Sequence, residues 1–335
     1  MKRPLIALLT VCATICLLAQ NPLRVMTWNV ENLFDTIHDE GKNDLEFTPE
    51  GGRHWSSYRY WRKLRDVART IIAANEDCVP DIVGLCEVEN DSVMRDLCQR
   101  TQLREFGYRY VMSASDDPRG IDVAMMYRPA RFKLMNVENL RIQPAIPSQT
   151  ATRDLLHVSG LILVEDSVSA ITTDTLHVIV VHLPSQLGGR PAKRLRKQVA
   201  EVLWQRVQDI INNTSDGKKP NIVVMGDFNA TLSDKLFRDT PLLTTDPAFT
   251  IRQRHSTQPT GTYRYRGIWQ CIDHLLVSPS FAEAQTARII TLPSLLEKNT
   301  SRGGYQPRRT YQGPAYHGGI SDHLPLYIEL PTTYK

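Results

Sequence analysis

Cysteine is scarce in this sequence and forms no metal-binding motif. Six of the 335 residues are cysteine, and two of them lie in an apolar N-terminal segment. The other four have irregular spacings and include no Cys-x-x-Cys pair: Cys78, Cys86, Cys98 and Cys271. This excludes a disulfide framework and argues against a sulfur-bound metal. We expect buried free thiols, with a Cys78–Cys98 disulfide as the alternative in an oxidising compartment.

A large excess of one charge is also absent. The chain has 40 Lys and Arg against 36 Asp and Glu, a net charge of +4, and loss of Lys2 and Arg3 with an N-terminal signal would leave 38 against 36. Proteins that coat nucleic acid normally carry a larger basic excess, so the bulk charge implies no nucleic-acid partner, although nucleic acid stays open as a substrate. The 41% of hydrophobic residues is typical of a folded chain with a sizeable core.

No apolar run reaches the length of a membrane-spanning helix. The longest, Leu5–Leu18, has 14 residues, whereas a spanning helix needs about 20. It follows two basic residues and precedes a polar stretch, which is the order of a secretory signal. We therefore expect residues 1–20 to be the signal peptide of an exported, periplasmic or secreted protein, and residues 21–335 to form a single domain without a transmembrane anchor. The alternatives are an N-terminal core helix and a lipid anchor.

Short apolar or alternating segments predict strands along the whole chain. Seven such segments occur: Arg24–Val30, Asp81–Val88, Val123–Pro129, His177–Leu183, Asn221–Gly226, Ile272–Val277 and Leu324–Leu330. Apolar residues at helical spacing predict helices over residues 61–72 and 195–211. Because strands and helices mix throughout, we expect an α/β or α+β sandwich with helices covering the sheet faces. Three charged or glycine-containing segments predict loops: Asp35–Trp55, Asp116–Gly120 and Ser301–Gly319.

Nearly every predicted strand ends in Asn, Asp, Glu or His. These residues are Asn29 and Glu31, Glu87 and Glu89, His182, Asp227 and Asn229, Asp273 and His274, and Asp322 and His323. One polar strand end is ordinary, but six together suggest a shared polar site. Carboxylates and amides without cysteine suit Mg²⁺, with Mn²⁺ or Ca²⁺ as alternatives. With two histidines, such a site predicts metal-assisted hydrolysis of a phosphate ester by water.

Each of these segments also has an ordinary structural explanation when it is taken alone. Asp227 and Asn229 flank Phe228, so in an extended chain both polar side chains project to one side. The alternative for these three residues is an Asx turn after a strand. A lone His182 is more often a core or surface residue than a catalyst, and His323 alone fits a surface turn.

Taken together, three of the motifs resemble the endonuclease/exonuclease/phosphatase superfamily. They are Trp28–Val30, Gly226–Asn229 and Ser321–Pro325, in this order. The superfamily includes pancreatic-type deoxyribonucleases, abasic-site endonucleases, inositol-polyphosphate phosphatases and bacterial sphingomyelinases. The resemblance, which runs from about Leu23 to Leu330, implies a four-layer sandwich of two packed β-sheets flanked by helices. It also implies an exported phosphoesterase that acts on phosphodiesters or phosphomonoesters.

The resemblance further implies a set of metal ligands. Glu87 would be the principal ligand, with Asn29 beside it. Asp322 and Glu31 would complete a site for one or two ions, and Mg²⁺ is the ion that we expect.

The same resemblance implies catalytic roles. Asp227 would align or deprotonate the attacking water, and Asn229 would hold a phosphate oxygen. His323, oriented by Asp273, would stabilise the phosphate charge, and His182 would contact phosphate or assist the leaving group. The sequence Leu-Pro-Ser-Gln after His182 departs from the commonest pattern, Leu-Lys-Ser or a close variant.

The sequence constrains the substrate less than it constrains the type of reaction, because specificity within a fold depends on its loops. Asp122 is a candidate that either binds a substrate group or pairs with Arg119. Tyr263, Arg264 and Arg308 are further candidates, because interleaved Tyr and Arg stack on bases and grip phosphates. The alternative for the tyrosines and arginines is an exposed hairpin with alternating faces.

Three readings of the whole chain therefore remain. We expect an enzyme acting on a phosphorylated small molecule, a nucleotide or a nucleic acid, and we favour a compact phosphoester. A secreted endonuclease acting on DNA or RNA is the alternative, and a catalytically silent binding protein is the other class. The basic residues between 190 and 197 are interpreted as a solvated helix surface, and no stable protein partner is implied.

Overall fold

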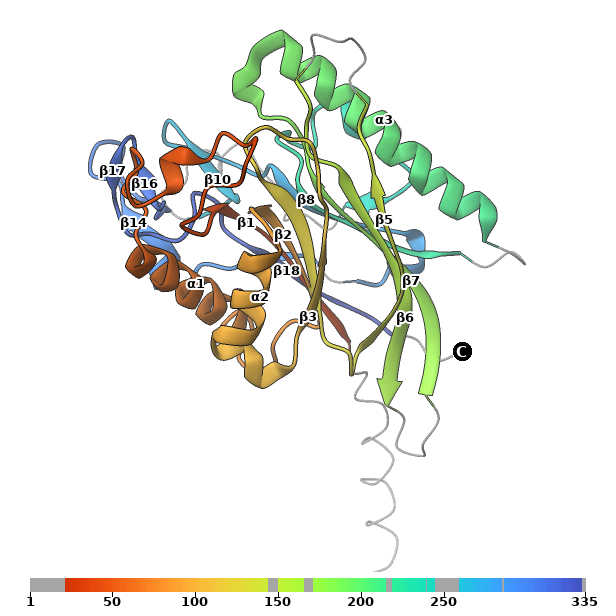
Figure 1. The fold of residues 1–335 in the computed structure, drawn as a ribbon. Helices are drawn as coiled ribbons and strands as arrows, with labels where there is room; N and C mark the ends of the chain where they lie inside the picture. The colour runs from red at the N-terminus through yellow and green to blue at the C-terminus, as the bar shows by residue number, and fades with distance from the viewer. Residues whose placement is uncertain are drawn as a thin grey trace, which may run out of the picture.

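The computed structural model describes seven stretches of the chain. They are residues 22–143, 150–165, 171–214, 219–238, 240–244, 259–284 and 286–332. The predicted signal peptide lies outside the described residues. Two six-stranded mixed sheets dominate the described part, and they pack face to face (Figure 1).

The first sheet has the order β13-β18-β1-β2-β4-β3. Its strands are β13 (Arg288–Ile289), β18 (Leu326–Leu330), β1 (Leu23–Leu33), β2 (Ile82–Val88), β4 (Asp122–Tyr127) and β3 (Arg109–Met112). β1 and β2 are parallel, and the other neighbours are antiparallel. The carboxyl ends of β1 and β2 therefore meet at the same edge.

The second sheet has the order β5-β6-β7-β8-β12-β9. Its strands are β5 (Phe132–Leu140), β6 (Leu155–Glu165), β7 (Ile171–His182), β8 (Asn221–Asp227), β12 (Asp273–Val277) and β9 (Leu243–Thr244). β7 and β8 are its parallel pair, so their carboxyl ends also meet at one edge. Three two-stranded sheets complete the described strands: β10 (Tyr263–Tyr265) with β11 (Ile268–Gln270), β14 (Leu296–Lys298) with β15 (Tyr305–Pro307), and β16 (Tyr311–Gln312) with β17 (Ala315–Tyr316).

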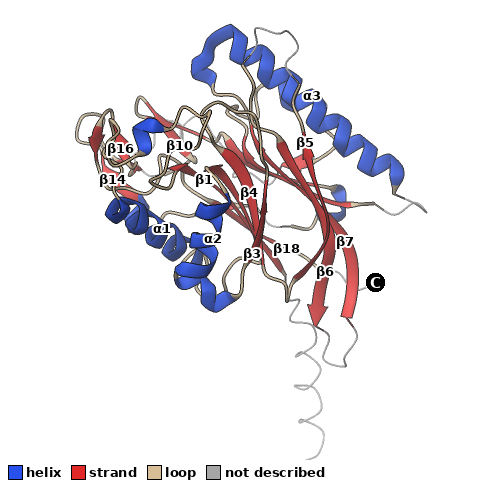
Figure 2. Ribbon diagram, in the orientation of Figure 1, coloured by secondary structure: helices blue, strands red, loops and turns tan. Residues whose placement is uncertain are grey.

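Helices cover the outer faces of both large sheets (Figure 2). α1 (Ser57–Ile72) and α2 (Asp91–Arg100) lie on the first sheet, and α3 (Gly189–Asn213) lies on the second. Side-chain alternation in β7 explains this arrangement. Val178 and Val180 pack between the sheets, whereas Ile179 and Val181 pack beneath α3. The expected four-layer sandwich is confirmed.

The strand and helix predictions overlap the observed elements. All seven predicted strands are present, and both predicted helices begin earlier, at Ser57 and Gly189. The sequence analysis did not predict β5, β6 or α2. The loop expected over Ser301–Gly319 contains the short strands β15, β16 and β17. Six short 3-10 helices lie in the described connections: Leu45–Phe47, Gln102–Phe106, Gln186–Gly188, Lys235–Phe237, Pro279–Phe281 and Pro293–Leu295.

The four cysteines of the described residues are free thiols, and the expectation that they are buried holds for three of them but not for Cys78. Cys86, Cys98 and Cys271 are buried, and Cys78 is exposed in the connection between α1 and β2. The alternative disulfide between Cys78 and Cys98 is not formed. In the described part of the chain, no helix has both the length and the apolar character needed to cross a bilayer.

Candidate active site

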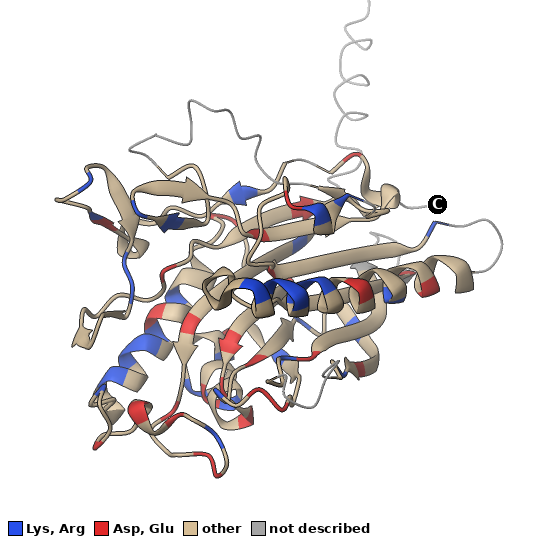
Figure 3. Ribbon diagram, turned by 90° about the horizontal axis from the view of Figure 1, so that it is seen from above, with Lys and Arg blue, Asp and Glu red and all other residues tan. Residues whose placement is uncertain are grey.

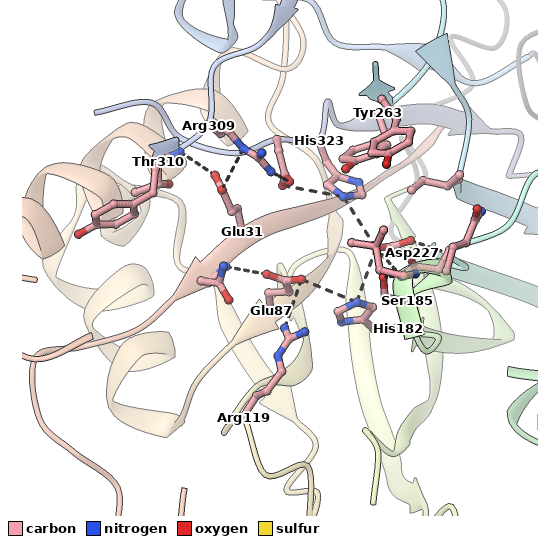
Figure 4. Close-up of a pocket in the computed structure, with 18 of the residues that line it drawn as sticks. Glu31, Glu87, Arg119, His182, Ser185, Asp227, Tyr263, Arg309, Thr310 and His323 are labelled. Atoms are coloured by element: carbon pink, nitrogen blue, oxygen red, sulfur yellow. Dashed lines mark hydrogen bonds and ion pairs between the residues drawn. The ribbon is translucent and has the colours of Figure 1, made fainter. Parts of the chain in front are cut away.

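A polar cavity of about 510 Å³ opens where the carboxyl ends of β1, β2, β7 and β8 meet (Figure 4). Eight of the predicted site residues line it: Glu31, Glu87, His182, Asp227, Asn229, Tyr263, Asp322 and His323. Asn29 and Asp273 are buried next to these residues and bond directly to them. The structure thus brings together all nine predicted catalytic and metal-binding residues.

Strand register explains why three of these residues are neighbours. His182 lies opposite Asp227 in the parallel pair β7–β8, and Asp273 lies opposite Asp227 in the antiparallel pair β12–β8. One row across three strands therefore carries all three side chains. Gly226 allows this close approach, since it has φ 138° and a Cβ there would lie 1.9 Å from the Val181 oxygen.

Asp227 is almost completely buried and accepts several hydrogen bonds. Its Oδ1 accepts from the Asn229 backbone nitrogen at 2.7 Å, and its Oδ2 accepts from Asn29 Nδ2 at 3.1 Å. Burial, with a further contribution from Asp273, raises the pKa of Asp227 to about 7. A carboxyl group with this pKa is suited to accept a proton near neutral pH.

His323 is held by Asp273 on one side of Asp227. Its Nδ1 lies 2.7 Å from Asp273 Oδ2, and its Nε2 lies 3.9 Å from both Asp227 Oδ2 and Asp322 Oδ1. Burial alone would lower the pKa of His323, but the surrounding carboxylates, Asp273 first among them, raise it well above its usual value. Tyr263 packs against the imidazole, with ring centroids 4.9 Å apart. The carboxylates around His323 therefore favour its protonated form.

His182 lies on the other side of Asp227, and its pKa is shifted in the opposite direction from that of His323. Its Nε2 is 3.6 Å from Asp227 Oδ2 and 3.8 Å from Glu87 Oε1, and its Nδ1 is buried without a hydrogen-bond partner. Burial, with Arg153 and other nearby cations, lowers the pKa of His182 well below its usual value. The buried aspartate is thus flanked by two imidazoles whose pKa values are shifted in opposite directions.

Glu87 lies at the end of β2 and is positioned by the end of β1. Its Oε2 accepts from the Asn32 backbone nitrogen at 2.8 Å, and its Oε1 accepts from Asn29 Nδ2 at 3.4 Å. Arg119 approaches Glu87 Oε1 to 3.5 Å. Backbone strain is concentrated here. Six non-glycine residues of the described chain have positive φ, and four of them line the cavity: Glu31, Asn32, Glu87 and Asn229.

Glu31 and Asp322 form the opposite wall of the cavity, together with Arg309. Arg309 pairs with Asp322 through its guanidinium, and its Nε lies 3.6 Å from Glu31 Oε1. Glu31 Oε2 also accepts a hydrogen bond from the Thr310 backbone nitrogen at 2.7 Å. Burial, with a contribution from Asp322, raises the pKa of Glu31 to about 8.

The donor set of the cavity fits a hard divalent cation. Its acidic side chains offer carboxylate oxygens and no thiolate. Burial first, and then Asp273 and Asp322 respectively, raise the pKa values of Asp227 and Glu31, and a bound cation would offset the cost of ionising these buried carboxyl groups. One potential ligand group at the cavity is Asp227, Asp273 and His323, whose ligand atoms all lie within 4.8 Å of one another, and it differs from the predicted ligand set.

Asn29 and Asn229 are oriented differently from their predicted roles. Asn29 Oδ1 accepts from the Glu31 backbone nitrogen at 3.0 Å, and its amide nitrogen faces Glu87 and Asp227. As a metal ligand, Asn29 would need to turn this amide. The Asn229 amide nitrogen donates to the Leu183 oxygen and to Asp227 Oδ2. In this structure both amides position Asp227.

Three of the four substrate-binding predictions differ from the structure. Asp122 neither lines the cavity nor pairs with Arg119, because its buried carboxylate accepts from Ser113 Oγ and the Ser115 nitrogen. Arg264 is on the expected hairpin, β10–β11, but its guanidinium donates to backbone oxygens of the neighbouring loops. Arg308 does not line the cavity, and the next residue, Arg309, does so instead.

Three neighbours of the site were either missed or given another role by sequence reasoning: Lys63 was missed, Arg119 was expected only as a partner of Asp122, and Arg309 was grouped with Arg308 as a candidate for substrate recognition. Arg309 and Arg119 come from loops, where no regular period indicates the direction of a side chain. Lys63 had a usable signal, since it follows Tyr60 by three residues and precedes Val67 by four, which places it on the buried face of α1.

Comparison with known proteins decides the classification. A sequence model of the Endonuclease/Exonuclease/phosphatase family matches residues 24–332. The chain belongs to this family. Its members are phosphoesterases and nucleases, and the predicted resemblance is confirmed. A search of curated proteins found no match to the chain.

Solved structures of the family share the fold. A mannosyl-6-phosphatase from Bacteroides thetaiotaomicron is 18% identical, with TM-score 0.56, over 92% of this chain and 100% of that one. D. rerio TDP2 complexed with single strand DNA product is 15% identical, with TM-score 0.54, over 93% and 100%. The human nocturnin catalytic domain with bound sulfate anion is 19% identical, with TM-score 0.53, over 93% and 95%. Identities this low show the fold alone.

Proposed function

We propose that this family member is a divalent-metal-dependent phosphoesterase that hydrolyses its substrate by direct attack of water. The observation that carries the proposal is the position of Asp227, which is buried between His182 and His323 and lines the polar cavity. A carboxyl group and two imidazoles therefore face the same space.

The side chains of the cavity divide the hydrolysis between them. Asp227 orients a water molecule and accepts its proton as the water oxygen bonds to phosphorus. The Nε2–H of His323 donates to a phosphoryl oxygen as negative charge develops, and Asp273 keeps that imidazole protonated and oriented. The ester P–O bond breaks, the leaving oxygen takes up a proton from water, and His182 would contact the phosphate or assist the leaving group.

Glu87, Asp322 and Glu31 are the residues that would hold the cation, with Asn29 beside Glu87, and Mg²⁺ is the ion expected, with Mn²⁺ or Ca²⁺ as alternatives. When bound, the ion supplies Lewis-acid polarisation of the phosphoryl group. Asn29, Asn32 and Arg119 position or neutralise Glu87 in this scheme.

A compact phosphoester is the substrate that we favour. The cavity volume of about 510 Å³ is in the range that holds a small molecule. Arg264 is committed to loop carbonyls and is not free to grip a phosphate backbone. The related mannosyl-6-phosphatase is named for a phosphorylated sugar.

A second candidate function, cleavage of single-stranded nucleic acid, is favoured by the charge on α3. Four exposed basic residues gather on its first turns, where the helix dipole disfavours cations (Figure 3): Arg190, Lys193, Arg194 and Lys197. Leu187, which immediately precedes α3, lines the cavity. One fold neighbour, TDP2, is complexed with a single strand DNA product.

A substrate panel tests both functions. Phosphorylated sugars, nucleotides, inositol phosphates, single-stranded DNA, RNA and plasmid DNA would be assayed with Mg²⁺, Mn²⁺ or Ca²⁺, and with EDTA, at two salt concentrations. We expect a small phosphoester to have the highest kcat/KM and EDTA to abolish turnover. Preference for nucleic acid that collapses with added salt would instead favour the nuclease. Full activity in EDTA, or restoration by Zn²⁺ alone, would contradict the metal assignment.

We also propose that the protein is exported, on the strength of the signal-like residues 1–20. Mature protein recovered from the native cell should lack at least Met1 to Leu18 and should occur outside the cytoplasm. An intact N-terminus in the cytosolic fraction would overturn this proposal.

A further inference from the structure

Lys63 is a buried lysine on the apolar face of α1. The same face carries Tyr60, Leu64 and Val67, which pack into the hydrophobic core. Lys63 is only 3% exposed, and it does not line the cavity. Burial of an ammonium group is costly unless its N–H groups find acceptors, so the acceptors of its Nζ indicate its role.

Both hydrogen bonds of the Lys63 side chain lead to residues that line the cavity. Its Nζ donates to the Glu31 main-chain oxygen and, at 2.9 Å, to Thr310 Oγ1. The Thr310 backbone nitrogen in turn donates to Glu31 Oε2 at 2.7 Å (Figure 4). Three residues from three segments of the chain, namely α1, the end of β1 and the loop before β16, therefore close one ring of hydrogen bonds.

The Glu31 backbone is not supported by the sheet at this point. The pairing of β1 with β2 runs from Val25 to Asn29 and resumes only at Leu33, and Glu31 lies inside this irregularity. Its φ of 48° is in the left-handed region, which is unfavourable for a residue with a Cβ and persists only when surrounding contacts enforce it. The hydrogen bond from Lys63 to the Glu31 carbonyl is one of these contacts.

Thr310 extends the same support to Arg309 and Asp322. Its Oγ1 also donates to the Ile320 oxygen at 3.2 Å. The preceding residue, Arg309, forms an ion pair with Asp322. Lys63 is therefore connected through Thr310 to both ends of the segment that carries Arg309 and Asp322.

We propose that Lys63 is a positioning residue, which holds Glu31 at the cavity and thereby sets the affinity of the protein for its divalent cation. This inference rests on the proposed metal dependence, in which Glu31 and Asp322 are among the residues that hold the cation. Lys63 acts through Glu31 and Thr310, since it does not line the cavity itself. Groups that orient metal ligands in this way typically contribute roughly 10- to 100-fold to metal affinity.

Direct measurement of Mn²⁺ affinity tests this role without an activity assay. Each protein would be titrated with Mn²⁺, and the free ion would be measured by electron paramagnetic resonance. We expect Lys63→Met to bind Mn²⁺ about 10-fold more weakly than the wild-type protein. The sign of the change is decisive, because loss of a positive charge alone would make the protein bind the cation more tightly. Tighter or unchanged binding by folded Lys63→Met would overturn the role of Lys63 and leave the proposed function intact.

Thr310 offers a second pair of variants, in which the charge of Lys63 is retained. Thr310→Val keeps the backbone hydrogen bond to Glu31 but removes the hydroxyl that accepts from Lys63, so it should weaken Mn²⁺ binding about 10-fold. Thr310→Ser keeps the hydroxyl and should bind almost as tightly as the wild-type protein. Equal affinities of these two variants would overturn the role of Lys63, and this pair decides the question if Lys63→Met does not fold.

Tyr60→Phe is the matched control in the same helix. It removes a buried hydrogen bond, from the Tyr60 hydroxyl to Asp96 Oδ2 at 2.9 Å, and neither residue lines the cavity. It should bind Mn²⁺ like the wild-type protein, and thermal unfolding should show that each variant is folded. Equal weakening in Tyr60→Phe would indicate a general loosening of α1 and would overturn the specific role of Lys63. No Mn²⁺ binding by any of the proteins would instead contradict the metal dependence itself.

Discussion

Charge at individual residues of the cavity is set by burial and by immediate neighbours. His182 and His323 flank the same aspartate, yet only His323 has a carboxylate at hydrogen-bonding distance. Burial therefore lowers the pKa of His182, whereas Asp273 and the other nearby carboxylates raise the pKa of His323. The two histidines are consequently not interchangeable, and their substitutions should have different effects on the pH dependence of turnover.

The role of Asp227 predicts a large loss of turnover in Asp227→Asn. The amide retains the shape but cannot accept the water proton, so kcat should fall by about 100-fold or more. Asp209→Asn, the same change on α3 outside the cavity, should be close to wild type. Steady-state kinetics of folded proteins checks this, and near-wild-type turnover of Asp227→Asn would refute its role.

The His323–Asp273 pair predicts strong non-additivity. His323→Ala should lower kcat by about 100-fold, because it removes a donor that acts mainly in the transition state. Asp273→Asn should cause a smaller loss and should lower the pKa of His323. Since Asp273 acts through His323, the double variant should be no slower than His323→Ala alone. Additive losses in this double-mutant cycle would show that Asp273 acts independently.

The individual site residues were predictable where they follow strands. Asp227 and His182 end buried apolar segments, so their sequence positions placed them at a shared edge. Arg309 was not distinguishable from Arg308, because both belong to a loop with no fixed side-chain period. The tertiary hydrogen bonds of this segment, among them those of Thr310 and Gly319, place Arg309 at the cavity, and they are not readable from the sequence.

Elements were recognised when one periodic pattern covered their length. The buried strands β7 and β8 are rich in Val and Ile, and α3 has a long apolar stripe. β5 was missed because most of its central residues are exposed or half-buried. α2 was missed because its ten residues provide fewer than three turns of pattern.

The junction of β7 and β8 predicts a sharp difference between two glycine substitutions. Gly226→Ala would place its Cβ 1.9 Å from the Val181 oxygen at φ 138°. It should lower the free energy of unfolding by at least about 3 kcal/mol, from backbone strain and overpacking together. Gly52→Ala, whose Cβ would meet nothing within 4 Å, should change it by less than about 0.5 kcal/mol. Urea unfolding of both variants checks this prediction. Equal free energies of unfolding for the two variants would contradict the close approach of Gly226 to the Val181 oxygen.

At the scale of the whole molecule, stability should depend on a histidine pair outside the cavity. His157, between β5 and β7, is 5% exposed, and its Nε2 lies 3.1 Å from His177 Nδ1. Burial, with His177 and Arg206, lowers the pKa of His157 to about 4. Protonation therefore favours the unfolded chain, whose histidine has a pKa of about 6.5.

The lowered pKa of His157 determines the direction in which the stability changes with pH. The stabilising contribution of neutral His157 is present above about pH 6.5 and is lost as the pH falls toward 4. Between pH 7.5 and pH 5, the wild-type protein should lose on the order of 2 kcal/mol more unfolding free energy than His157→Gln. Urea unfolding at both pH values measures the difference, and identical losses in the two proteins would exclude His157 as the source.

The distribution of thiols over the molecule makes it feasible to attach a label at one cysteine only. Cys78 is exposed and precedes β2, whereas the cavity lies at the other end of that strand, roughly 20 Å away at the usual rise per residue. Protein produced from residue 21 onward should therefore take up one maleimide under native conditions and four in denaturant, as counted by mass spectrometry. A fluorophore or a solid support coupled at Cys78 would leave the cavity open to solution.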